Sequence, residues 1–502
     1  MIPPSPGPSA PTLPIAVHGG PTGLAATYAR VRALATSYDS VGDRLRHRAG
    51  LGARALADAD LLESAVLAPL TFGRAEVAVA LATTGPDGVL TDSVGWEADA
   101  LLIRAAVRGL EEADQLVRSS LESLDYALGR AAGFTLGTLV IEGAVTVPVW
   151  LPPALLTVAG LVGVYLLLPP SLQQRVRDEG GELTEDLRDD IAHWIAEHPD
   201  EVQHLANGAG GLVDGFVDGL TPGIPSGSWP MSPTTEDAAG LLATFFPDDG
   251  SPDVSVRPDL GRPSPAPSSL AEVISHLDEV NTWSDDHHLG NNGTIEIQSW
   301  VDLSGITHHV VYLPGTDDLA TLPGHRGSDV RDLPADLVLL SGGQTTYGDG
   351  IVQAMHDAGI DRDDPVLVVG HSEGGMEGVW LAHHAHDFSI TQVVTVGSPV
   401  ATMDPGPTPV LSLENHGDLV PLLDGEPNPD TPTRVTVEFT DPDPAGAAGT
   451  HDLHHYVRGA AAVDASTDPA LTDQLDSLRA AGFLAGGAAE TRSQVFQITR
   501  SP

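Results

Sequence analysis

Hydrophobic residues follow different periods in the two halves of the chain. In the first half they recur every three or four positions, which is the spacing of an amphipathic helix. One such stripe extends from Leu24 to Leu45 and a second from Trp96 to Leu128. The sequence T-G-P-D-G at 84–88, a strong helix breaker, lies between them. The pattern predicts two long helices that pack as an antiparallel hairpin or bundle.

In the second half, from Gly293 onward, short strand patterns alternate with helical ones. Alternating β and α units predict a mainly parallel sheet covered by helices on both faces. The first strand alternates in the manner of an edge strand. Strands are expected at Thr294–Val301, 309–313, 366–369, 392–396, 409–413 and Arg434–Phe439, and helices at 269–283, 345–358, 374–386, after His451 and at 471–481.

These patterns divide the chain into four regions, and the predicted fold class is α/β preceded by an all-α region. Residues 1–21 are rich in proline and are predicted to be disordered, with H-G-G at 18–20 as a turn. Residues 22–221 form the helical domain and residues 269–502 the α/β domain. Between them, residues 222–268 are rich in Pro, Gly and Ser and are predicted to be a linker with at most a short helix.

One segment of the helical domain, residues 131–168, carries Glu142 as its only charge. On length alone it would span a bilayer once, but prolines at 148, 152 and 153 interrupt it. A buried hairpin and a membrane-associated segment both remain open. The N-terminus lacks a basic stretch followed by an apolar one, so we expect a chain that is cytoplasmic or exported without a cleavable signal peptide.

Composition narrows the expected partners. The 502 residues include 69 acidic and 24 basic ones, all of the latter arginine, for a net charge of −45 at pH 7. Nucleic acid is not an expected partner, because phosphate binding needs a basic surface. Cysteine is absent, which excludes disulfides, thiolate metal sites and a cysteine nucleophile.

The most informative motif is P-V-L-V-V-G-H-S-E-G-G at 365–375. A run of aliphatic residues ends at Gly370, and a segment with helical spacing follows Ser372. A serine at the tip of a strand-to-helix turn is a nucleophile elbow. Glycines such as Gly370 and Gly374 avoid clashes between side chains and the neighbouring strand and helix. Because 55 glycines make a chance G-x-S-x-G plausible, the serine needs matching partners elsewhere in the chain.

A serine nucleophile requires a base, and the base requires an acid that orients it. The acid is expected after a later strand, where L-S-L-E-N-H-G-D at 411–418 ends in Asp418. Glu414, His416 and Asp424 are neighbouring alternatives. Asp418 is favoured because it lies where the chain leaves the strand and enters the next element. The order Ser, Asp, His along the chain is also the one that this kind of fold requires.

The base is expected in T-H-D-L-H-H-Y at 450–456. His451 lies at the start of a predicted helix, whereas His454 and His455 lie within it and remain alternatives. Histidines at this spacing also suit a metal ion, but no matching carboxylate–histidine motif occurs elsewhere. We therefore expect neither a metal nor a cofactor.

An oxyanion hole needs two backbone N–H groups. One is expected from Glu373, which follows the nucleophile, and the other from Thr316 in the L-P-G-T loop at 313–316. The carboxylate of Glu373 suits the helix dipole, and we expect it to repel anionic substrates.

Four motifs together resemble the α/β-hydrolase superfamily, especially its lipase-like and esterase-like branches. They are G-H-S-E-G-G at 370–375, V-T-V-G-S-P-V at 394–400, L-E-N-H-G-D-L-V-P at 413–421 and H-x-x-x-x-Y at 451–456. The resemblance covers residues 290–502. It implies Ser372 as nucleophile, Asp418 as acid, His451 as base and a small-molecule ester or lipid-like substrate. Lipases often carry a neutral residue where this chain has Glu373, which argues against long-chain lipase activity more than against hydrolysis.

Other functions fit the same residues. The triad also suits acyl transfer or thioester or amide cleavage, since a fold does not determine a substrate. In a third reading the hydrolase fold is a binding module, and the helical half acts in assembly or export. That half resembles the helical-hairpin substrates of actinobacterial type VII secretion, although V-G-W at 94–96 departs from their Trp-x-Gly turn. It would contribute homo-oligomerisation through its helices and membrane association through residues 131–168.

Overall fold

The computed structural model describes residues 13–141, 175, 207–220, 234–244, 246–262, 264–285, 290–318, 327–442, 446–486 and 491–501. The chain divides into two compact units. One is formed by residues 23–120, and the other by residues 1–22 together with 121–502. The helical domain predicted over 22–221 is therefore shared between the two units.

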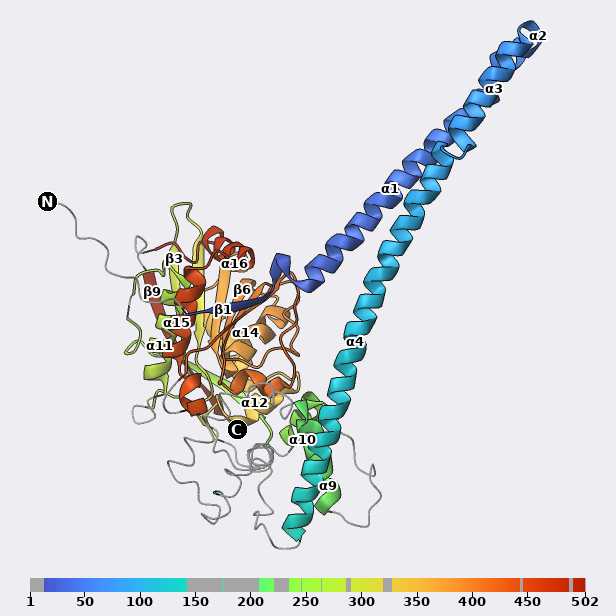
Figure 1. Ribbon diagram of the computed structural model, residues 1–502. Coiled ribbons are helices and arrows are strands. Elements are labelled where there is room, and N and C mark those ends of the chain that lie inside the picture. Colours follow the sequence, from blue (N-terminus) through green and yellow to red (C-terminus); the bar gives the residue numbers. More distant parts are fainter. Residues whose placement is uncertain are drawn as a thin grey trace, which may run out of the picture. The chain divides into compact units, whose positions relative to one another are not determined.

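The unit of residues 23–120 is an antiparallel helical hairpin (Figure 1). Tyr28 near the start of α1 donates a hydrogen bond of 3.0 Å to Asp114 of α4, and Arg104 of α4 pairs with Asp39 of α1. The predicted hairpin and the break at 85–88 are confirmed. Its helices are α1 (Leu24–Leu56), α2 (Ala59–Leu67), α3 (Pro69–Thr84) and the first part of α4 (Val89–Ile141).

The apolar segment of residues 131–168 is described only as far as the end of α4. Its remainder lies outside the described residues. Among the helices that the structure describes, none combines the length and low polarity needed to cross a bilayer. Helix α9 (Ala209–Leu220) packs against the end of α4, where Arg130 pairs with Asp218 at 2.5 Å.

Nine described strands form one mixed sheet in the order β1-β8-β7-β6-β5-β4-β3-β9-β2. Strands β4 to β8 are parallel, and the strands that flank them pair antiparallel. The strands are β1 (Ile15–Gly19), β2 (Ser251–Val256), β3 (Thr294–Val301), β4 (Thr307–Leu313), β5 (Pro365–His371), β6 (Ser389–Val396), β7 (Val410–Asn415), β8 (Arg434–Phe439) and β9 (Thr491–Ser501).

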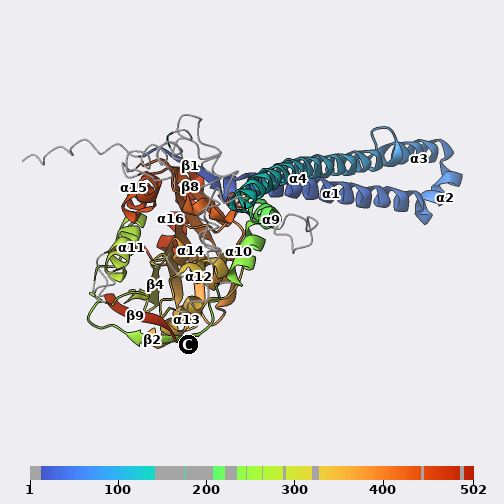
Figure 2. The same ribbon diagram turned by 90° about the horizontal axis from the view of Figure 1, so that it is seen from below.

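Helices cover both faces of this sheet, so the predicted α/β class is confirmed. Helices α11 (Leu270–Ser284), α15 (Leu453–Asp464) and α16 (Pro469–Ala480) pack on one face. Helices α12 (Leu333–Leu340), α13 (Thr346–Ala358) and α14 (Glu373–His384) pack on the other (Figure 2). Alternate residues of the central strands, such as Leu367 and Val368 of β5, enter the two opposite cores.

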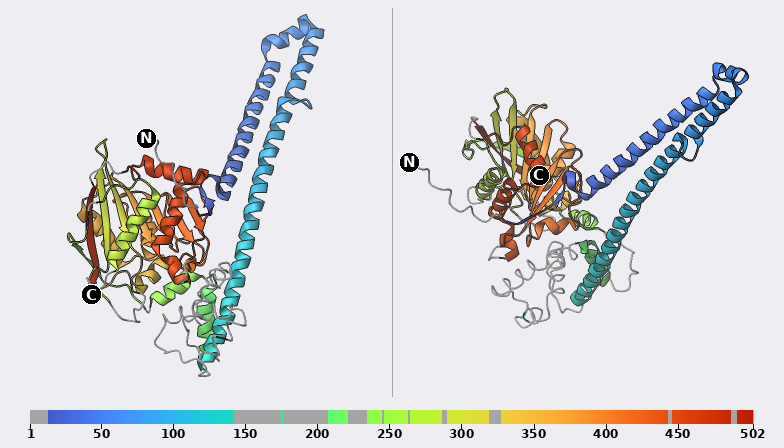
Figure 3. Two further views of the ribbon diagram at one scale, coloured as in Figure 1. Left: turned by 60° about the vertical axis from the view of Figure 1, so that its left-hand side comes forward. Right: turned by 45° about the horizontal axis from the view of Figure 1, so that its top comes forward.

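Three strands of the sheet were not predicted. The disorder expected over 1–21 is wrong for β1, which pairs with β8, and the linker expected over 222–268 contains β2 and helix α10 (Thr235–Ala243). In Figure 3 the dark red strand that ends at C is β9, which lies between β2 and β3. Because β9 covers β3, the expected edge strand Thr294–Val301 is an interior strand, buried along all but its last residue.

Candidate active site

The predicted site residues lie at the carboxyl ends of parallel strands. Thr316 follows β4, Ser372 follows β5, Asp418 follows β7 and His451 follows β8. Because these strands are parallel, their carboxyl ends lie along the same edge of the sheet, which is where ligands bind in open α/β folds.

Ser372 has a strained backbone. Its φ of 54° and ψ of −121° make it the only described residue other than glycine with a positive φ. Its N–H donates to the Val396 carbonyl at 2.9 Å. Side chains at the flanking glycines would not fit: a Cβ on Gly370 would lie 2.1 Å from the Gly374 carbonyl oxygen, and one on Gly374 2.1 Å from that of Leu313. The sharp turn therefore depends on these two glycines.

The structure brings Asp418 and His451 together. His451 Nδ1 lies 2.7 Å from Asp418 Oδ2, and the Asp418 side chain is fully buried. The Tyr456 hydroxyl donates to the same oxygen, while Oδ1 accepts the Val420 N–H at 2.9 Å. Because the carboxylate only accepts, His451 Nδ1 carries a hydrogen and Nε2 is left to take a proton.

The alternative bases have other environments. His454 is exposed and its ring contacts that of His455 at an angle of 40°. The Nδ1 of His455 lies 2.9 Å from Asp441 Oδ2. Among the alternative acids, Asp424 accepts the Ala401 N–H at 2.6 Å. Within the described part of the chain, no three His, Asp or Glu side chains converge as metal ligands.

The loop after β4 lies directly against Ser372. A Cβ on Gly315 would lie 2.8 Å from Ser372 Cβ, so only glycine allows this approach. The backbone N–H groups of Thr316 and Glu373 form no hydrogen bond to another described residue. These are the two N–H groups predicted to form the oxyanion hole. The Thr316 hydroxyl is engaged elsewhere, since it donates to Asp336 at 3.0 Å.

The side chain of Glu373 lies inside the fold. It is fully buried, and within the described residues neither carboxylate oxygen has a hydrogen-bond partner. Burial, and then the nearby carboxyl of Asp336, raise the pKa of Glu373 well above its usual value. The carboxyl of Glu373 is therefore enclosed within the fold and does not face solvent, and repulsion of anionic substrates by this group stays a prediction.

Arg331, which belongs to no motif, holds the loop beside Ser372. Its side chain is fully buried, and Nη1 donates to the Gly315 carbonyl at 2.6 Å. Its Nη2 lies 2.5 Å from the Asp317 carboxylate and 3.1 Å from that of Asp285. No local spacing in the sequence indicates Arg331, because its partners lie 14 to 46 residues away along the chain.

Removing this guanidinium is expected to destabilise the α/β unit. Arg331→Met leaves the buried Asp317 carboxylate without its counter-charge, which typically costs about 3–5 kcal/mol. Chemical denaturation would measure the loss. The matched control is Arg479→Met, which breaks an exposed pair with Asp476 at 2.9 Å and should cost less than about 1 kcal/mol. Equal stability of the two variants would contradict the role given to Arg331.

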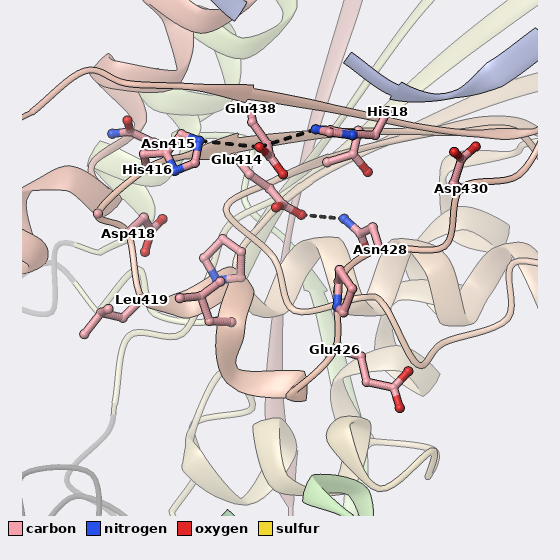
Figure 4. Close-up of a pocket in the computed structure, with 15 residues that line it drawn as sticks. His18, Glu414, Asn415, His416, Asp418, Leu419, Glu426, Asn428, Asp430 and Glu438 are labelled. Carbon is pink, nitrogen blue, oxygen red and sulfur yellow. Dashed lines mark hydrogen bonds and ion pairs between the residues drawn. The ribbon is translucent and has the colours of Figure 1, made fainter. Parts of the chain in front are cut away.

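A cavity of about 340 Å³ lies beside the loop after β7 (Figure 4). Five carboxylates line it, and His18 of β1 and His416 both approach Glu438 at 3.4 Å. Asp418 contributes to the wall, but Ser372 and His451 do not. We therefore do not assign this cavity to the substrate. The carboxylates are those of Glu414, Asp418, Glu426, Asp430 and Glu438.

Comparison with known proteins gives no further guide. No protein-family model matches the sequence, and searches of curated proteins and of solved structures found no similar chain. Any assignment of function therefore depends on the geometry of the residues described above.

Proposed function

We propose that the chain is a serine hydrolase of the α/β-hydrolase type that cleaves a carboxylic ester. The observation that carries the proposal is the 2.7 Å contact between His451 Nδ1 and Asp418 Oδ2, at the sheet edge where Ser372 has its strained φ. The chain order Ser, Asp, His and the strand-to-helix turn at Ser372 are those of a nucleophile elbow with its triad.

In the proposed reaction Ser372 Oγ attacks the ester carbonyl while His451 Nε2 takes the hydroxyl proton. Asp418 stabilises the resulting imidazolium and keeps its tautomer. The N–H groups of Glu373 and Thr316 donate to the oxyanion. Collapse of the tetrahedral intermediate expels the alcohol, which receives the proton from His451. A water molecule, deprotonated by His451, then releases the acid and restores Ser372.

The most direct test is covalent labelling of the full chain with a neutral fluorophosphonate. We expect one adduct per chain, located at Ser372 by peptide mass spectrometry, because the probe reacts with an activated serine. Ser372→Ala and heat-denatured wild type are the controls, and both should remain unlabelled. Absence of labelling in the native protein would overturn the proposal and favour a binding module.

Labelling alone does not separate hydrolysis from the other reactions of an acyl-serine. A panel of neutral esters, thioesters and amides, assayed with and without added alcohol acceptors, would do so. We expect the esters to turn over fastest and water to be the acceptor. Preferential transfer to an added alcohol would indicate an acyltransferase on the same triad.

A further inference from the structure

His371, the residue before the nucleophile, lies against the base. It ends β5, is 7% exposed, and its Nε2 lies 3.0 Å from the backbone carbonyl oxygen of His451. A carbonyl oxygen only accepts hydrogen bonds, so Nε2 must be the nitrogen that carries hydrogen. The contact therefore determines the tautomer of His371.

The two imidazole rings also pack together. Their centroids are 4.3 Å apart and their planes are inclined by 30°, so the ring of His371 limits rotation of the His451 side chain. On its other side, His371 meets the loop after β4: a Cβ on Gly315 would lie 3.2 Å from its Nδ1. His371 thus fills the space between the Gly315 loop and the base.

This contact joins two parts of the site that come from distant strands. Ser372 follows β5 and His451 follows β8, with β6 and β7 between them in the sheet. The segment before His451 is tied to the β7 side, because the Thr450 hydroxyl donates to the Gly417 carbonyl at 2.9 Å. The His371 bond ties the same segment to the β5 side, next to the nucleophile.

The environment of His371 keeps its ring neutral. Its buried Nδ1 has no hydrogen-bond partner among the described residues, so a second N–H there would be unsatisfied. Burial, followed by the nearby charges of His451 and Arg331, lowers the pKa of His371 well below its usual value, and Tyr456 faces it with its ring 6.3 Å away. A neutral neighbour does not oppose the imidazolium that forms on His451.

We propose that His371 is a positioning residue: its Nε2–H holds the His451 carbonyl and its ring orients the His451 imidazole toward Ser372. Only the expected effect of His371 on the reaction rate rests on the proposed function. The hydrogen bond and the tautomer are properties of the folded chain and can be measured without any substrate.

Two substitutions separate the hydrogen bond from the ring. His371→Phe keeps a flat ring but loses the donor, whereas His371→Gln keeps an N–H at similar reach. We expect the Phe variant to lose about 10- to 100-fold in kcat/KM on a neutral ester, mostly in kcat, because misplacement of a reacting group by about 1 Å has effects of this size. The Gln variant should recover at least half of that loss on a logarithmic scale. When kcat/KM is plotted against pH, only the Phe variant should differ from wild type on the acid side of the profile.

The matched control is His384→Phe, since His384 Nδ1 also lies 2.9 Å from a carbonyl, that of Trp380, at the far end of α14. It should leave kcat/KM unchanged. A Phe variant of His371 with wild-type kcat/KM, or Phe and Gln variants reduced equally, would overturn the positioning role.

A substrate-independent measurement distinguishes failure of this inference from failure of the proposed function. In ¹⁵N-histidine-labelled protein, with His371→Gln used for assignment, His371 should be the neutral Nε2–H tautomer and should take up a second proton only below the ordinary histidine pKa. A His371 that titrates near pH 6.5, or that carries its proton on Nδ1, would overturn the inference even in an active enzyme. If wild type shows no Ser372-dependent turnover, the proposed function fails. The ¹⁵N spectrum would still show whether His371 is a hydrogen-bond donor through Nε2.

Discussion

Ser372→Ala is expected to lower kcat on a neutral ester by at least about 10,000-fold, because Ser372 forms the acyl intermediate in the proposed reaction. The rate remaining would come from binding and the oxyanion donors alone. The measurement is steady-state turnover of purified protein on a chromogenic ester, with active sites counted by the fluorophosphonate. Full turnover by the Ala variant would show that the reacting group lies elsewhere.

A second variant tests the backbone strain at the same position. Glycine accommodates the φ of 54° without cost, whereas alanine keeps a Cβ in the strained region. We expect Ser372→Gly to be inactive as well, but more stable than Ser372→Ala by about 1 kcal/mol, despite the greater chain entropy of glycine when unfolded. Equal or lower stability of the Gly variant would contradict the nucleophile-elbow geometry.

Asp418→Asn is expected to lower kcat by about 1,000- to 10,000-fold with little change in the fold. Both carboxylate oxygens accept hydrogen bonds: Oδ1 from the Val420 N–H, and Oδ2 from His451 and Tyr456. An amide has one oxygen only. If that oxygen stays with Val420, the NH₂ group faces His451 and favours the tautomer with hydrogen on Nε2, which cannot accept the serine proton.

The matched control for this substitution is Asp452→Asn. Asp452 is adjacent to His451 in sequence, is exposed, and makes no capping hydrogen bond with its side chain. Asp452→Asn removes one negative charge near His451, as Asp418→Asn does, but it leaves the contact that orients His451 in place. The kcat of this variant should therefore stay within about twofold of wild type. A similar loss in both variants would mean that charge, and not the orientation of His451, is what Asp418 supplies.

Local sequence was sufficient for much of the α/β architecture. Strands Thr294–Val301 and Arg434–Phe439 were predicted with the bounds that the structure shows, because a run of β-branched residues between turn residues is a local signal. The turn at Ser372 could also be predicted from the sequence, since glycines on both sides of a serine indicate that backbone segments approach closely there. These features depend on a few neighbouring residues.

Other strands could not be predicted because their stability comes from partners far along the chain. Strand β1 follows a proline-rich stretch and is held by β8, more than 400 residues later. Strand β9 has mostly polar residues around Val495, Phe496 and Ile498, and it pairs with β2 and β3. Both strands are therefore stabilised by pairing with segments that lie far away in the sequence.

For the candidate site, the sequence by itself determined which residue types were present and the order Ser372, Asp418, His451 along the chain. Only the tertiary structure decided which of three neighbouring histidines meets Asp418, that the Glu373 side chain is buried, and that Arg331 and His371 brace the loops on either side of Ser372. The reason is physical: helical and strand periodicity depend on neighbours in sequence, whereas burial, pKa and hydrogen-bond partners depend on packing between segments that are distant along the chain.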